Sequence, residues 1–415
     1  MTGARRDGRF RVVVTGIGVK SPAGNSLDEA FATVLSAKSA AAVVPHLVEQ
    51  HAPVRIACQV LPFELESYIT RRELRQIDRA TALAICAAVD AVRQAQLLPG
   101  YAPDRVGVHL GTGIGGLPSM EAITRDYGEA PMTIPVHSVP RTMSNAGAAR
   151  IAIRYGLQGS CTTYATACAS GTTAIGEAAR RIRYGELDAV VTGGYDSAIT
   201  SVMLGGFARM RALSDRDDGP ERASCPFDAG RDGFVMAEGA TVLVLERRDT
   251  ALARGAPILG EIAGYAANCD AHHIVAPRAD ATAATACMTA AIADAGLSPG
   301  DIGQINAHGT STRLNDDAEA TAVHRCFAGQ APPVTAVKGV TGHLFGGSGA
   351  LEAAIALVCA ERLTVPPVAN LVSSDVADRI DVVGGAPRSV AKAPVLSNSF
   401  GFGGHNACLV LTPAD

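Results

Sequence analysis

The sequence predicts an α/β protein with a large buried core, and three observations support this prediction. The chain has 415 residues, 47% of them hydrophobic and 18% charged, which is ample for a core and too long for one small domain. Short apolar runs alternate with amphipathic stretches along most of the sequence. No low-complexity segment or short-period repeat interrupts this alternation.

The expected strands are short apolar runs, and the expected helices carry apolar residues at helical spacing. The strands are Val12–Val14, Val106–Leu110, Ala189–Thr192, Val242–Leu245, Ile302–Asn306, Val334–Val337 and Cys408–Leu411. Helical spacing occurs in segments 174–182 and 351–358, and Gly185 closes the first. Strands that alternate with helices favour packed α/β layers. Residues 248–261 read as a helix end, a turn and a new strand, so we divide the chain into 1–255 and 256–415.

Composition argues against several classes of protein. A net charge of −4 gives no sign of a nucleic acid or an anionic membrane surface as the main partner. No apolar run reaches the ~18 residues that a membrane span needs, and no apolar segment typical of a signal peptide follows the start of the chain. The ten cysteines are scattered without CxxC pairs. We therefore expect a reducing, cytoplasmic setting.

A glycine-rich motif, GTGIGG at 111–116, follows an expected strand and resembles a dinucleotide-binding loop. Such a site also needs an acidic residue about 20 positions further on. Glu121 and Asp126 come too early, and residues 130–140 contain no carboxylate. We therefore expect no nucleotide cofactor, and interpret the glycines as letting the backbone lie close to a substrate channel.

The segment 164–185 predicts a strand, a sharp turn of small residues and a helix, with Cys168 at the turn. A nucleophile at such a turn faces the positive end of the helix dipole, which favours thiolate over thiol. Backbone N–H groups exposed at the same turn are able to bind an oxyanion. On these residues alone, a buried and inert cysteine before a helix remains an equally good interpretation.

Two histidines and a lysine in the C-terminal half favour the catalytic interpretation. His308 follows one expected strand, and Lys338 and His343 follow another. Active sites of α/β sheets lie beyond the carboxyl ends of the strands, where Cys168 also lies. The remaining histidines have no metal-ligand spacing, so we expect no metal.

At these residues the sequence resembles the β-ketoacyl-acyl-carrier-protein synthases of the thiolase superfamily, specifically the elongating type with two catalytic histidines. The matching segments are ordered along nearly the whole chain: 12–26, 166–171, 211–240, 306–312, 338–352 and 397–407. The resemblance implies a duplicated five-layer α-β-α-β-α fold with mixed sheets, usually dimeric. It also implies decarboxylative Claisen condensation of a malonyl thioester with an acyl group on a cysteine.

The resemblance implies a role for each matched residue. Cys168 would carry the acyl group, and His308 and His343 would bind the malonyl thioester carbonyl and promote loss of CO2. Lys338 would set the electrostatics of the site. The N–H groups of Cys168 and Phe400 would form the oxyanion hole. The remaining implied roles are gating of the acyl pocket by Phe400, pantetheine binding by Thr310 and Thr312, and lining of the acyl tunnel by Ile114 and Phe207.

The subclass follows from the residues present. Initiating synthases have Asn where His343 stands, thiolases have a second cysteine where this chain reads SFGFGG, and chain-length factors lack the nucleophile. Segments 71–84 and 313–320 look closer to bacterial polyketide ketosynthases. Fatty-acid and type II polyketide synthesis both remain open, as do a homodimer and a heterodimer with a chain-length-factor homologue.

The expected partner is an acidic acyl carrier protein that bears acyl and malonyl groups on phosphopantetheine. Arg72, Arg75 and Arg79 have the spacing of one helix face, and Arg211 lies in a matched segment, so these arginines are the expected docking residues. A solvated helix face is the alternative. Two other functions stay open: a thioester hydrolase or acyltransferase, and a non-catalytic subunit of a ketosynthase heterodimer.

Overall fold

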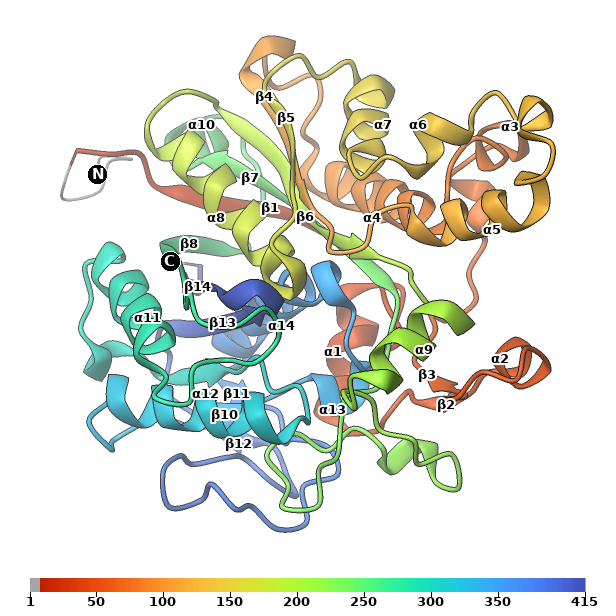
Figure 1. Cartoon of the computed structure of the whole chain (residues 1–415). Coiled ribbons are helices and arrows are strands. Elements are labelled where there is room, and N and C mark those ends of the chain that lie inside the picture. Colours follow the sequence, from red (N-terminus) through yellow and green to blue (C-terminus); the bar gives the residue numbers. More distant parts are fainter. Residues whose placement is uncertain (1–7, 415) are drawn as a thin grey trace.

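The computed structural model describes residues 8–414, and its centre is a ten-stranded mixed sheet (Figure 1). The strands run in the order β10-β9-β13-β14-β8-β1-β7-β6-β4-β5. The N-terminal half contributes β1 (Val12–Lys20), β4 (Val106–Gly111), β5 (Cys161–Tyr164), β6 (Ala189–Asp196) and β7 (Gly239–Arg247). The C-terminal half contributes β8 (Gly260–Cys269), β9 (Gln304–Asn306), β10 (Val334–Thr335), β13 (Val395–Gly401) and β14 (His405–Thr412).

The two halves of the sheet repeat one topology. In the first half, β5, β4 and β6 are parallel neighbours, and β7 and then β1 follow antiparallel. In the second half, β10, β9 and β13 are parallel, and β14 and then β8 follow antiparallel. Within the ten-stranded sheet, the two halves are joined where β1 pairs with β8, through Val13–Glu261 and Val14–Gly260. This repeat agrees with the predicted duplicated α/β fold.

Helices form three layers around the two half-sheets. α4 (Arg79–Ala95) and α7 (Ala146–Tyr155) pack on the outer face of the first half-sheet, and α11 (Thr282–Asp294) and α12 (Arg313–Cys326) cover the second. α8 (Ser170–Arg183) and α14 (Ser348–Arg362) lie between them and contact strands of both halves. A Cβ atom on Gly171 would lie 2.6 Å from the carbonyl oxygen of Gly346, so only glycine allows this close approach.

Shorter elements complete the described chain. They are α1 (Leu27–Leu35), α2 (Pro45–Glu49), α3 (Arg71–Leu74), α5 (Leu117–Tyr127), α6 (Ser138–Thr142), α9 (Ser201–Arg209), α10 (Arg248–Ala253), α13 (Lys338–Thr341) and the pairs β2 (Ala42–Val43) with β3 (Ile56–Ala57) and β11 (Thr364–Val365) with β12 (Arg388–Ser389). α10 ends before β8 begins, and we propose the intervening loop as the boundary between the halves, which includes position 255/256.

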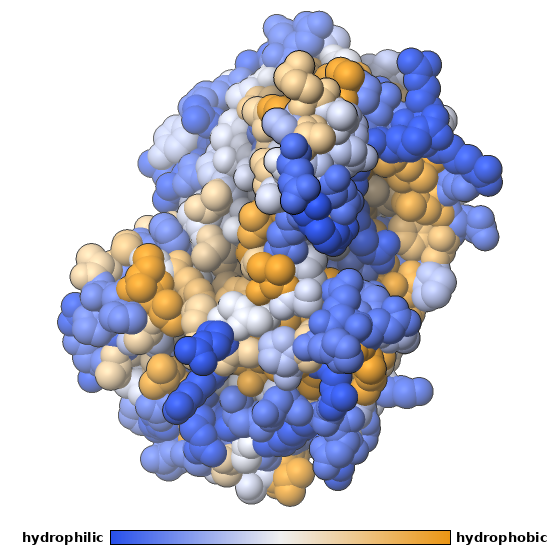
Figure 2. Space-filling model, turned by 45° about the vertical axis from the view of Figure 1, so that its right-hand side comes forward, coloured by the Kyte–Doolittle hydropathy of each residue, from blue (hydrophilic) through white to orange (hydrophobic). Residues whose placement is uncertain are grey.

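Each predicted strand lies within or overlaps an observed one, but β13 was absent from the prediction. Its sequence is rich in Ser and Asn, and Ser397, Asn398 and Ser399 are buried nonetheless. Hydrogen bonds account for part of this burial, because the Ser399 hydroxyl contacts that of Thr172 and the Asn398 amide nitrogen donates to Glu319. The hydroxyl of Ser397 has no hydrogen-bond partner among the described residues. Within residues 8–414, no helix combines the length and apolarity required to cross a bilayer. Polar residues dominate the face in Figure 2, with apolar residues gathered in smaller patches between them.

Candidate active site

The carboxyl ends of the parallel strands bring the predicted residues together. Cys168 lies in a short turn between β5 and α8, directly after Ala167, whose φ of 50° is tolerated here by a small side chain. His308 follows β9, and Lys338 and His343 follow β10. One side of the site therefore comes from the N-terminal half, and the other comes from the C-terminal half.

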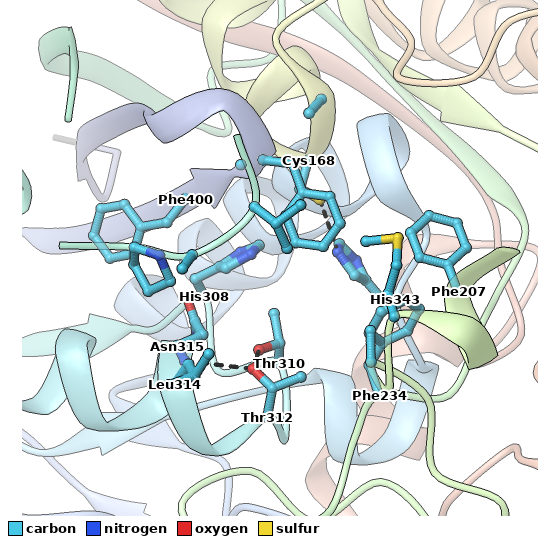
Figure 3. Close-up of a pocket in the computed structure, with 18 of the residues that line it drawn as sticks. Cys168, Phe207, Phe234, His308, Thr310, Thr312, Leu314, Asn315, His343 and Phe400 are labelled. Carbon is cyan, nitrogen blue, oxygen red and sulfur yellow. Dashed lines mark hydrogen bonds between the residues drawn. The ribbon is translucent and has the colours of Figure 1, made fainter. Parts of the chain in front are cut away.

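Figure 3 shows both histidine rings turned toward Cys168. Nε2 of His343 lies 3.0 Å from Sγ of Cys168. One ligating atom from each of Cys168, His308 and His343 falls within 4.8 Å of the others. The two imidazole rings meet edge to face, with centroids 5.5 Å apart. A small substrate group near the sulfur is therefore within reach of both rings.

A buried lysine places a positive charge close to the two histidines. Nζ of Lys338 lies 3.2 Å from Nδ1 of His308 and forms a buried ion pair with Glu352. Burial, reinforced by the charge of Lys338, lowers the pKa of both His308 and His343 well below the usual range. Both imidazoles are therefore neutral at pH 7. Since an ammonium group only donates, Nδ1 of His308 accepts from Lys338, and Nε2 carries the imidazole proton.

Burial adds an effect on the nucleophile that the sequence analysis did not include. We expected the helix dipole to favour the thiolate, but burial raises the pKa of Cys168 to about 11. The charge of Lys338 and the N–H of Phe402 oppose that effect only in part. Burial of Cys168 therefore acts against the stabilisation of the thiolate that we expected from the helix dipole.

A backbone N–H that contacts Sγ of Cys168 comes from Phe402, two residues after the expected Phe400. Phe400 lies within β13 and pairs with Asn406 of β14, whereas Phe402 follows the end of the strand, in the turn 402–404. Phe400 contributes its ring, 6.1 Å from that of His308. The residue whose amide faces the sulfur is thus Phe402.

A cavity of about 520 Å³ opens onto the three residues. The sequence-predicted residues that line it are Cys168, His308, His343, Thr310, Thr312, Ile114, Phe207, Phe400 and Arg211. Thr310 and Thr312 lie together, with hydroxyl oxygens 2.9 Å apart (Figure 3). One wall is aromatic, because the Phe207 ring stacks on Phe345 at 5.3 Å and meets Phe402 at 6.2 Å.

Two buried carboxylates that support the site escaped the sequence analysis. Glu319 accepts the N–H groups of His308 and Gly309, both at 2.8 Å, and burial raises its pKa to about 7. Asp196 accepts the N–H groups of Gly113, Ile114, Gly115 and Gly346 and the Thr112 hydroxyl, and burial raises its pKa to about 6. For Asp196 the available signal was an acid at the end of the apolar strand β6, whereas Glu319 follows Asp316 and Asp317 in α12 and nothing in the sequence sets it apart from them.

Asp196 also gives the 111–116 motif a structural role. This loop and Gly346, both of which lie beside the cavity, donate to one carboxylate. Gly113 and Ile114 line the cavity, as expected for a backbone close to a substrate channel.

The Cys168, His308 and His343 cluster also has the donor types of a zinc site. Metal-bound histidines usually donate their second N–H to an acceptor. Here the second nitrogen of His308 meets the ammonium of Lys338, which only donates. The Nε2 proton that this contact requires blocks metal ligation, so the cluster suits hydrogen-bond donation better.

The docking arginines are arranged differently from the expectation. Arg72 lies in the single turn of α3 and Arg75 ends it, whereas Arg79 begins α4. Thr70 caps the first helix and Asp78 caps the second, so the segment is broken and the three arginines do not share one helix face. Arg79 pairs with buried Glu238, while Arg72 and Arg75 are exposed.

Comparison with known families decides the assignment. The family described as "Beta-ketoacyl synthase, N-terminal domain" matches residues 9–251, and "Beta-ketoacyl synthase, C-terminal domain" matches residues 259–372. The chain belongs to the β-ketoacyl synthase family. It is 40% identical to 3-oxoacyl-(acyl-carrier-protein) synthase 2 of Synechocystis sp., over 96% of this chain and 97% of that protein. The protein of the same name from Staphylococcus aureus (strain MRSA252) is 38% identical, over 97% and 98%.

Solved ketosynthases have the same fold. A type II polyketide ketosynthase in complex with its acyl-carrier protein matches with a TM-score of 0.90 at 30% identity, over 98% of this chain and 100% of that one. The ishigamide ketosynthase/chain length factor matches with a TM-score of 0.90 at 32% identity and the same coverage. These matches confirm the family resemblance and the thiolase-like fold inferred from the sequence.

Proposed function

We propose that this enzyme is an elongating β-ketoacyl synthase that condenses a malonyl group on an acyl carrier protein with an acyl group held on Cys168. The observation that carries the proposal is the convergence of one thiol and two neutral imidazoles at the end of one cavity. A thiol suffices for acyl transfer, and the pair of neutral N–H donors is what decarboxylation requires.

In the first step, the Cys168 sulfur attacks the acyl thioester and expels the carrier thiol. The new bond joins Sγ to the acyl carbon, the bond to the carrier sulfur breaks, and the proton of Cys168 ends on the departing thiol. Burial raises the pKa of Cys168 to about 11, so the thiol predominates at neutral pH and has to lose its proton during this step. The N–H groups of Cys168 and Phe402 are placed to hold the developing oxyanion.

In the second step, the malonyl thioester loses CO2, and its electrons form an enolate on the thioester carbon and oxygen. Nε2–H groups of His308 and His343 donate to that oxygen, so neutral imidazoles stabilise the negative charge without a metal. The enolate carbon then attacks the acyl carbon on Cys168 and expels the sulfur, which takes up a proton. One 3-oxoacyl thioester and one CO2 leave per cycle.

The remaining cavity residues suit the two ends of the substrate. The hydroxyls of Thr310 and Thr312, which line the cavity, suit hydrogen bonds to the amides of a pantetheine arm, whereas Ile114 and Phe207 suit contact with an apolar acyl chain. Arg211, which also lines the cavity, and exposed Arg72 and Arg75 provide positive charge for an acidic carrier. Ten free cysteines, the nucleophile among them, suit the reducing cytoplasm.

A second copy of the chain, or a chain-length-factor homologue, would pair along strand β5. This strand forms one edge of the sheet, and Cys161 is exposed on it. In the segment between α5 and α6, Met132 and Val136 are more than nine-tenths exposed. An unpaired sheet edge and exposed apolar residues are each features that favour association. Light scattering of the chain alone should give the mass of a dimer if the homodimer is correct.

The test is mass spectrometry of the carrier-bound products after incubation with malonyl-carrier and a panel of acyl-carrier primers. Elongation predicts a 3-oxoacyl group two carbons longer than the primer, together with CO2. A thioester hydrolase would release free acid without elongation, and a non-catalytic subunit would leave Cys168 unacylated. Either result would reject the proposal.

A further inference from the structure

Ser348, the first residue of α14, contacts the side of His343 that faces away from Cys168. Its hydroxyl oxygen lies 3.0 Å from Nδ1 of His343 and accepts the backbone N–H of Leu344 at 2.9 Å. Both side chains are buried, with exposed fractions of 2% each. Sequence analysis gave this serine no role.

The direction of the Ser348–His343 hydrogen bond follows from counting donors and acceptors. The serine oxygen already accepts one proton from Leu344, and its own proton needs an acceptor. Among the residues that the structure describes, Nδ1 of His343 is the only acceptor within hydrogen-bond distance of that hydroxyl. If Nδ1–H donated instead, the buried hydroxyl proton would be left without a partner, which costs about 1–3 kcal/mol. The hydroxyl therefore donates to Nδ1.

We propose that Ser348 is a positioning residue that fixes His343 as the tautomer with its proton on Nε2. Because the imidazole is neutral, an acceptor role for Nδ1 leaves the proton on Nε2, directed at the Cys168 sulfur 3.0 Å away. Lys338 fixes His308 in the same way from its own Nδ1 side. Both histidines thus present an Nε2–H donor. The ammonium group of Lys338 fixes this tautomer in His308, and the hydroxyl of Ser348 fixes it in His343.

This tautomer has a chemical consequence for both steps, and it rests on the proposed condensation. A His343 with Nε2–H donates to the enolate oxygen during decarboxylation, but it is unable to take the proton of Cys168. The other tautomer would reverse these abilities, because a bare Nε2 is a base and not a donor. Ser348 therefore favours the decarboxylation step at the expense of thiol activation.

The experiment compares Ser348→Ala and Ser348→Thr with the unmodified enzyme. Ser298→Ala is the control, because Ser298 caps the short turn 299–301, on a segment that does not line the cavity. The first readout is the ¹⁵N spectrum of histidine-labelled protein, with the His343 signal assigned by its loss in His343→Gln. We expect a protonated Nε2 and a bare Nδ1 in the unmodified enzyme and in Ser348→Thr. Ser348→Ala should shift protonation toward Nδ1.

The second readout is the ratio of two rates. Decarboxylation of malonyl-carrier by Ser348→Ala should fall about 5- to 10-fold, the equivalent of one hydrogen bond. Alkylation of Cys168 by iodoacetamide should stay the same or rise, because a bare Nε2 becomes available as a base. A merely structural role would lower both rates together, and that result would overturn the proposal. So would a proton on Nδ1 in the unmodified enzyme, or an unchanged ¹⁵N spectrum in Ser348→Ala. If the unmodified enzyme does not decarboxylate malonyl-carrier, the proposed function fails, while the spectrum still tests the tautomer.

Discussion

Nε2 of His343 lies 3.0 Å from Sγ of Cys168 and joins the two halves of the molecule at the reacting centre. Cys168 comes from the turn after β5 and His343 from the loop after β10, so neither half contains the site alone. The thiol carries the acyl group in the proposed cycle, whereas the imidazoles act on the malonyl group. Substitutions should therefore separate the two reactions.

Cys168→Ala should abolish condensation and retain decarboxylation of malonyl-carrier. Alanine offers no nucleophile to hold the acyl group. His308 and His343, which come from other loops, keep their N–H donors, and the backbone oxyanion site does not use the thiol. The measurement is CO2 release beside detection of the condensed product. A folded Cys168→Ala protein that releases no CO2 above background would show that decarboxylation depends on the sulfur.

His343→Ala should show the reverse behaviour. Acylation of Cys168 should persist, because the nucleophile and the backbone N–H groups remain. Decarboxylation should fall by about 10²–10³, the usual cost of one lost oxyanion donor. Intact-protein mass spectrometry detects the acyl-enzyme, and CO2 release reports the second step. Normal decarboxylation by this variant would contradict the role assigned to His343.

The alkylation rate of Cys168 should keep rising with pH up to about pH 11. Below the pKa of a thiol, the fraction present as reactive thiolate falls tenfold for each pH unit. Burial raises the pKa of Cys168 to about 11. The rate with iodoacetamide should therefore increase about 100-fold from pH 8 to pH 10. Peptide mass spectrometry measures the alkylation of Cys168 and, in the same sample, of the exposed Cys269, whose alkylation shows that the reagent is active. A plateau near pH 8 would contradict the raised pKa.

The sequence predicted the parts of the site that lie in recognisable local patterns. Cys168, His308 and His343 each follow an apolar run, and the carboxyl ends of parallel strands meet at one edge of a sheet. Three features depend on contacts between distant segments, and a local pattern does not reveal such contacts. Asp196 accepts an N–H of Gly346, 150 positions away, and Phe402 reaches Cys168 from the turn between β13 and β14. Burial raises the pKa of the Cys168 thiol.

Asp196→Asn should lower the free energy of unfolding by about 2–4 kcal/mol. Asparagine replaces one of the two carboxylate oxygens by an NH2 group. If that oxygen is Oδ2, the new N–H donors would face the backbone N–H groups of Gly113 and Gly346, which donate to Oδ2 in the unmodified enzyme. Denaturant unfolding measures the loss. The matched control is Asp104→Asn, an exposed aspartate that should change stability by less than about 0.5 kcal/mol. Equal stability of the two variants would show that the loop holds without the carboxylate.

Charge reversal at Arg72 and Arg75 should weaken use of carrier-bound substrate and spare a substrate that carries only pantetheine. Both arginines are exposed, and only the carrier-bound substrate brings an acidic surface to them. The double variant Arg72→Glu with Arg75→Glu should therefore raise KM for malonyl-carrier about tenfold, with kcat unchanged. Added salt should narrow the difference from the unmodified enzyme, because it screens exposed charges.

Lys392→Glu is the matched control for this reversal. Lys392 is exposed and precedes β13 at Val395, and the strand runs from there toward Phe400 at the site. It therefore lies at the opposite end of the strand from the cavity, where a docked carrier would not reach. Its reversal changes the net charge in the same direction and should leave KM for both substrates unchanged. If Lys392→Glu raised KM as much as the arginine variant, the effect would come from net charge alone. If the arginine variant weakened both substrates equally, Arg72 and Arg75 would not contact the carrier, and docking would have to use another face.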